Sequence, residues 1–138
     1  MCQAAVTGRA TAQTLLLGVT VLTSHTDCTL RETGFRTTAE DEVLLLADLA
    51  KGTGITGLVA SPKEVPLLRA HYGSVLTIVT PGVRPSWSEA GDQKRFVTPA
   101  DALRAGADYL VIGRPITAAP DPGEALRRVI EEIAGMPD

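Results

Sequence analysis

The sequence has 138 residues, of which 44% are hydrophobic and 21% charged, so it has the size and composition of one globular domain. A net charge of −3 and an aromatic content of 4% argue against binding of nucleic acid or of a membrane surface. The two cysteines, Cys2 and Cys28, show no zinc-type spacing, and no apolar run reaches membrane-spanning length, so we expect a cytoplasmic protein without metal.

Four short apolar runs predict four β-strands. Residues 1–14 come before them and are interpreted as the tail of a preceding helix. The runs are rich in Val, Leu and Ile and are continuous rather than alternating, which is typical of strands buried on both faces of a parallel sheet. They lie at residues 15–23, 56–60, 75–80 and 108–112.

Helix start and stop signals separate these runs. A helix start is a capping side chain with an acidic residue three positions later, and three of the starts also carry proline at or next to the first helical position. The predicted caps are Thr37, Ser61, Thr98 and Asp121. Glycine marks each predicted helix end, at Gly52 and Gly54, Gly73, Gly106, and Gly135.

The predicted order alternates strand and helix four times. Such alternation indicates βαβ units, right-handed crossovers and a parallel α/β sheet. Four βα units make half of an eight-stranded TIM barrel or a small open sheet. The whole chain, 1–138, is expected to form this single (βα)4 domain.

In parallel α/β folds the loops that follow the strands carry the chemistry. The run at 108–112 leads into Gly113 and Arg114. A glycine lets a ligand approach the backbone, and an arginine offers a planar pair of donors that suits phosphate. A phosphate site is one interpretation, and a plain turn with a solvated charge is the other.

The loop at 80–98 is longer than a usual βα connection. Arg84 and Gln93 are its candidate phosphate donors, and residues 86–90 form a candidate lid over the site. A polar loop without a role is the alternative interpretation.

Four segments together resemble bacterial orotidine 5′-phosphate decarboxylase, in that family's order and at about its spacing. The likeness extends from Met1 to Ala134. The segments are Gly18–Ser24 (GVTVLTS), Thr80–Pro85 (TPGVRP), Gly91–Arg95 (GDQKR) and Gly106–Ile116 (GADYLVIGRPI).

This resemblance implies a fold, an activity and a set of roles. The family folds as a (βα)8 barrel, works as a homodimer, and converts orotidine monophosphate (OMP) into uridine monophosphate (UMP) and CO2 without a cofactor. By resemblance, Thr23 binds the nucleotide, Ser24 lies near the pyrimidine and Pro81 lines the base pocket. The positions that match the family's phosphate-binding residues are Arg84, Gln93, Gly113 and Arg114.

The chain also departs from the family pattern. The family's catalytic lysine and aspartates occupy a stretch of the form Asp-x-Lys-x-His-Asp, and none of the three lysines here, Lys51, Lys63 and Lys94, lies in such a stretch. The chain therefore resembles strands five to eight only, with a phosphate site and no catalytic residues, and we expect it to be inactive alone. Two alternatives remain: a non-catalytic phosphate- or nucleotide-binding half-barrel, and another phosphate-handling barrel enzyme.

A half-barrel would leave two strand edges and one apolar wall open. We expect the inward-facing residues to include Val19, Val21, Leu58, Ile78 and either Leu110 or Val111. Exposed apolar edges favour pairing with another chain. A homodimer, or a complement supplied by a missing first half, is the expected assembly.

Overall fold

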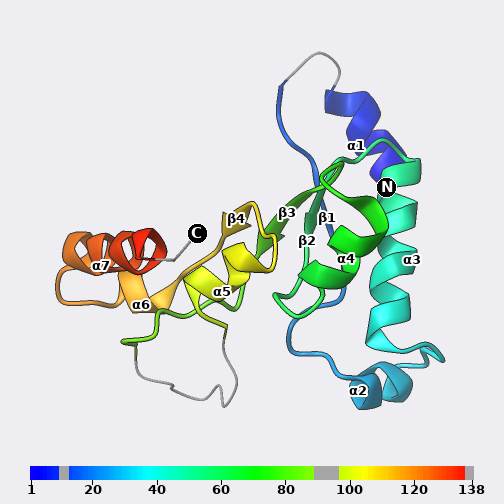
Figure 1. The fold of residues 1–138 in the computed structure, drawn as a ribbon. Coiled ribbons are helices and arrows are strands. Elements are labelled where there is room, and N and C mark those ends of the chain that lie inside the picture. The colour runs from blue at the N-terminus through cyan, green and yellow to red at the C-terminus, as the bar shows by residue number, and fades with distance from the viewer. Residues whose placement is uncertain (10–12, 89–96, 136–138) are drawn as a thin grey trace.

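The computed structural model describes residues 1–9, 13–88 and 97–135. Its centre is a parallel sheet with strand order β1-β2-β3-β4 (Figure 1). The strands are β1 (Leu17–Val19), β2 (Gly57–Val59), β3 (Thr77–Thr80) and β4 (Tyr109–Leu110). The helices are α1 (Cys2–Arg9), α2 (Asp27–Glu32), α3 (Ala39–Gly52), α4 (Val65–Tyr72), α5 (Pro99–Arg104), α6 (Arg114–Thr117) and α7 (Pro122–Ala134).

The predicted alternation of strand and helix is confirmed, and each neighbouring pair of strands runs parallel. Two short helices, α2 and α6, add to the predicted order, and α2 contains Cys28. Within the described residues, no helix is long and apolar enough to cross a membrane.

The helix starts follow the predicted caps in part. The hydroxyl of Thr98 and the carboxylate of Asp121 each accept a backbone N–H three residues later, as expected. The prediction for α3 was wrong by one residue, because Thr38 is the cap and the hydroxyl of Thr37 instead donates to Glu42 at 2.9 Å. The prediction for α4 was also wrong, because residues 62–64 form a turn after Ser61 and the helix begins at Val65.

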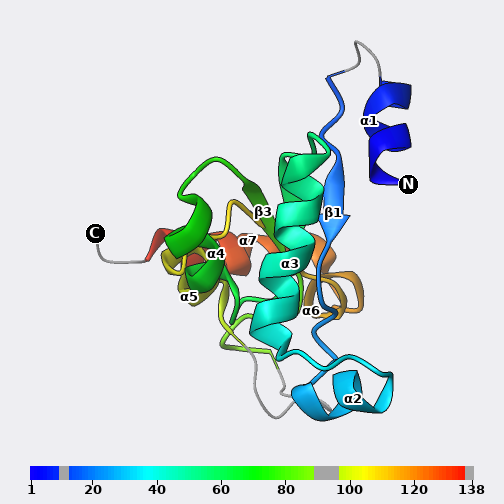
Figure 2. The ribbon, with the colours of Figure 1, turned by 90° about the vertical axis from the view of Figure 1, so that its right-hand side faces the viewer.

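The two faces of the sheet differ sharply in exposure. Leu58 and Ile78 point to the face that α3 and α4 cover, where both are buried, and the two views show these helices along one side of the strands (Figures 1 and 2). On the opposite face the outer strands carry exposed side chains, with fractions of 41% for Leu17, 58% for Val19 and 60% for Tyr109, whereas Val59 and Val79 between them are half-buried.

Two expectations about burial are therefore corrected. The strands are not buried on both faces, since β1 and β4 each carry exposed apolar side chains. Leu58 and Ile78 also do not face inward, because strand residues alternate between faces and these two belong to the helix-covered set. Val19 and Val111 do lie exposed, as expected for an uncovered wall.

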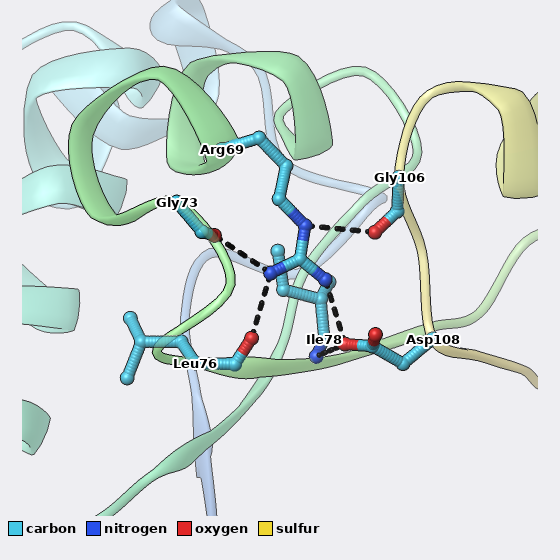
Figure 3. A network of polar contacts seen from close by, with 6 residues as sticks. All are labelled: Arg69, Gly73, Leu76, Ile78, Gly106 and Asp108. Carbon is cyan, nitrogen blue, oxygen red and sulfur yellow. Dashed lines mark hydrogen bonds and ion pairs between the residues drawn. The ribbon is translucent and has the colours of Figure 1, made fainter.

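A polar network closes the end of the sheet where β3 and β4 begin (Figure 3). The Arg69 guanidinium on α4 donates to the carbonyls of Gly106 (2.8 Å), Gly73 (2.9 Å) and Leu76 (2.8 Å). It also pairs with Oδ2 of Asp108 at 2.6 Å, and that oxygen accepts the N–H of Ile78 at 2.7 Å. This arginine joins α4, β3 and the end of α5 at the edge opposite the candidate site.

Candidate functional site

The carboxyl ends of the four parallel strands share one edge of the sheet, which is where ligands bind in such folds. Thr23 and Ser24 follow β1 in an exposed turn. Pro81 follows β3 and is half-buried. The next residue, Gly82, has a φ of +77°, and a Cβ built there would lie 3.7 Å from Cγ2 of Thr23. The structure thus brings the segments after β1 and β3 together, although β2 lies between these strands.

The segment after β3 folds back on itself around Arg84. Val83 is buried and forms an isolated parallel bridge with Val97. The backbone N–H of Arg84 donates to the carbonyl of Val97 at 3.1 Å, and the side chain of Arg84 is half-buried. Arg84 therefore lies at the base of the long loop, close to the end of β3.

The next residues of this loop are attached to α7. The N–H of Ser86 donates to Oε2 of Glu132 at 3.0 Å, and the ring of Trp87 lies under the guanidinium of Arg128. Residues 86–88, the described part of the candidate lid, are thus bound to α7 in this structure. Residues 89 and 90, and the predicted phosphate donor Gln93, lie outside the described residues.

Gly113 and Arg114 follow β4, the neighbour of β3. Gly113 is exposed and caps α6, and nothing in the described structure lies within 4 Å of a Cβ built there. Arg114 is exposed, and its side chain makes no hydrogen bond or ion pair with the residues that the structure describes. None of its guanidinium donors is used by the part of the chain that the structure describes, so they can bind an anion.

One titratable group at this edge was not singled out from the sequence. Burial raises the pKa of Glu64, which follows β2, although its Oε2 accepts the N–H of Ser61 at 2.9 Å and that bond acts in the opposite direction. The signal was present as the Ser61–Glu64 spacing, which we interpreted as a helix cap only. Lys63 lies beside it, exposed, in the turn after β2.

A second missed group is buried at the end of β3. The hydroxyl of Thr80 is fully buried and has no hydrogen-bond partner among the described residues. Within those same residues, no group of three His, Cys, Asp or Glu side chains is arranged to hold a metal ion. Besides the Glu64 carboxyl and the Lys63 ammonium, this edge offers guanidinium groups, hydroxyls and backbone amides, and these donors suit an anionic ligand.

Comparison with known proteins gives a consistent result. The family model for "Orotidine 5′-phosphate decarboxylase / HUMPS family" matches residues 1–129. Orotidine 5′-phosphate decarboxylase of Geotalea daltonii is 55% identical over 118 residues, which are 86% of this chain and 49% of that protein. The enzyme of Rhodopseudomonas palustris is 50% identical over 133 residues, covering 96% of this chain and 57% of that one.

The fold comparison agrees with the sequence comparison. The crystal structure of orotidine 5′-phosphate decarboxylase from Lactobacillus acidophilus superposes with a TM-score of 0.77 at 36% identity, covering 96% of this chain and 58% of that one. The chain thus spans about half the length of the curated relatives that it matches.

Proposed function

Because the chain belongs to the orotidine 5′-phosphate decarboxylase / HUMPS family, we propose that it binds the 5′-phosphate of a pyrimidine nucleotide, OMP or UMP, at the carboxyl edge of its sheet. The observation that carries this proposal is the placement of Arg114. It is the first residue of α6, shortly after β4, and its exposed side chain makes no ion pair or hydrogen bond with any described residue. A guanidinium in this state binds phosphate through two parallel hydrogen bonds.

The other roles follow from the residues around it. Arg84, after the end of the neighbouring strand, is the second cation of the phosphate site. Gly113 leaves room for the phosphate to approach the backbone. Gln93 contributes a further donor. Thr23 and Ser24 face the nucleoside.

Pro81 lines the base pocket in this proposal. Its support is the short separation between the segments after β1 and β3, at Thr23 and Gly82. With Thr23 and Gly82 this close, the residues proposed to bind the nucleoside adjoin the loop that carries Arg84.

We also propose that the chain corresponds to strands five to eight of the family barrel and needs a complement to decarboxylate. An ammonium group beside the reacting ring carbon stabilises the developing negative charge and delivers the proton. Of the three lysines, Lys51 ends α3 and lies 5.3 Å from the Tyr72 ring, Lys63 is exposed in the turn after β2, and Lys94 lies outside the described residues.

The phosphate proposal is tested by calorimetric titration with UMP, inorganic phosphate and uridine. We expect UMP and phosphate to compete for one site and uridine to bind far more weakly, because the phosphate supplies the binding energy. Equal affinity for uridine and UMP would disprove a phosphate site. In the same samples, release of CO2 from OMP well above the uncatalysed rate would show that the chain needs no complement.

A further inference from the structure

In the segment after β3, two consecutive residues, Ser86 and Trp87, contact α7. The N–H of Ser86 donates to Oε2 of Glu132 at 3.0 Å, and the Ser86 hydroxyl donates to the same oxygen at 3.1 Å. The guanidinium carbon of Arg128 lies 4.1 Å from the centroid of the Trp87 ring, within the range of a cation–π contact. Arg128 and Glu132 are four residues apart, so both contacts form on one face of the helix.

Arg84 lies between two fixed points of this segment. On one side its own N–H is bonded to the carbonyl of Val97 at 3.1 Å. On the other side Pro85 is fully buried and Ser86 is held by Glu132. The backbone at Arg84 is therefore fixed from both directions, and α7 supplies one of the two restraints.

The same helix, α7, also contacts the helix that carries Arg114, the other proposed phosphate-binding arginine. Gly113 and Arg114 begin α6, which is in contact with α7, and only residues 118–121 separate the two helices (Figure 1). One helix thus contacts both the segment that carries Arg84 and the helix that begins with Arg114, and these follow neighbouring strands.

We propose that Glu132 and Arg128 are positioning residues for phosphate binding by Arg84, a proposal that rests on the phosphate site proposed above. Neither residue touches the anion. Glu132 holds the backbone N–H of Ser86 and Arg128 packs on the Trp87 ring, and together they fix the place from which the guanidinium of Arg84 reaches the phosphate. A guanidinium already in place loses less conformational entropy when the anion binds.

Because Glu132 is negatively charged, a positioning role and simple electrostatic repulsion predict opposite effects of removing it. A carboxylate near a phosphate site repels the anion, so its removal alone would strengthen binding. A positioning role predicts that removing Glu132 weakens binding of the anion. Glu131, its neighbour on α7, is exposed and its side chain makes no hydrogen bond or ion pair with the described residues, so Glu131→Ala removes the same charge without releasing the loop.

The test is calorimetric titration of UMP into the full chain and three variants. We expect Glu132→Ala to bind about fivefold more weakly or worse, Ser86→Ala to lose about twofold, and Glu131→Ala to bind as well as wild type or better. Trp87 is the only tryptophan. Its emission should shift in Glu132→Ala and stay unchanged in Glu131→Ala.

Each outcome decides between named explanations. Wild-type affinity in both Glu132→Ala and Ser86→Ala overturns the positioning role while the phosphate site stands. Equal losses in Glu132→Ala and Glu131→Ala also overturn it, because the loop contact would then be irrelevant. If the wild-type chain does not bind UMP, the proposed function fails and this inference with it. Should Glu132→Ala not fold, Ser86→Ala decides alone, since it removes one hydroxyl and no charge.

Discussion

Glu64 is half-buried after β2, and this burial raises the pKa of its carboxyl above the usual 4.5. The folded chain then holds the proton more tightly than the unfolded chain does. Its contribution to stability is present in full below pH 4.5 and is lost as pH rises through the folded pKa. This residue makes the fold less stable at neutral pH than its hydrogen bond to Ser61 would suggest.

We predict that Glu64→Gln gains stability relative to wild type as pH rises from 4 to 7. The amide oxygen still accepts the Ser61 N–H, whereas the cost of burying a charge disappears. Urea unfolding at both pH values measures the difference in free energy, with Glu131→Gln as the exposed control. A Glu64→Gln variant whose disadvantage grows toward pH 7 would contradict this reasoning.

Local residue patterns indicated where the candidate site residues lie along the chain, but not which distant segments they contact. Gly113 and Arg114 stand where expected because the end of an apolar run fixes where the following loop begins. The contact between Ser86 and Glu132 spans 46 residues, and no local pattern indicates which helix a loop will meet. The raised pKa of Glu64 depends on the packing around it in the folded chain, which a capping motif does not reveal.

At the scale of elements, Arg69 joins pieces that are far apart in the sequence. Its guanidinium makes four hydrogen bonds, to three carbonyls and to Asp108, and its side chain is only 20% exposed. Gly106, whose φ is +107°, leaves room for it, since a Cβ there would lie 3.0 Å from Cγ of Arg69. The network thus couples α4 to the start of β4.

We predict that Arg69→Ala lowers the free energy of unfolding by about 2–3 kcal/mol, because the partner carbonyls and Asp108 lose charged donors. Arg104→Ala is the matched control. Arg104 pairs with Asp101 within α5, both side chains are more than half exposed, and we expect a loss of about 0.5 kcal/mol or less. Denaturant unfolding that shows equal losses for the two variants would show that the network adds no stability.

The elements themselves were largely predictable, because hydrophobic runs and caps are local signals. The start of α3 was not, since Thr37 and Thr38 each have an acidic residue three positions later, Glu40 and Asp41. The bond from Thr37 to Glu42 decides between them. The continuous apolar runs of β1 and β4 led to a wrong prediction of burial on both faces. One face of these strands is exposed in the structure.

At the scale of the whole molecule, exposed apolar side chains gather where a covering layer is absent from the described fold. One set lies on the sheet face without helices. Others lie on α3 and α7, the helices at the two ends of the sheet. The exposed side chains are Leu17, Val19, Tyr109 and Val111 on the sheet, Leu45 and Leu49 on α3, and Leu126 and Ile130 on α7.

We predict that the chain forms a homodimer or a larger species at micromolar concentrations. At about 25 cal/mol for each Å² of apolar surface, an open sheet face costs several kcal/mol, a large part of a total stability of about 5–15 kcal/mol. Light scattering after size-exclusion chromatography measures the mass. A monomer that unfolds cooperatively would show that the sheet is stable with this face in water.

The most direct test of the phosphate site is the affinity of UMP for wild type and for Arg114→Ala, measured by titration calorimetry. Loss of a charged donor to phosphate should cost about 1.5–3 kcal/mol, which is a weakening of about tenfold or more. Arg104→Ala, which removes an exposed arginine from α5, should bind like wild type. Equal affinity of wild type and Arg114→Ala would contradict the assignment of this edge as the nucleotide phosphate site.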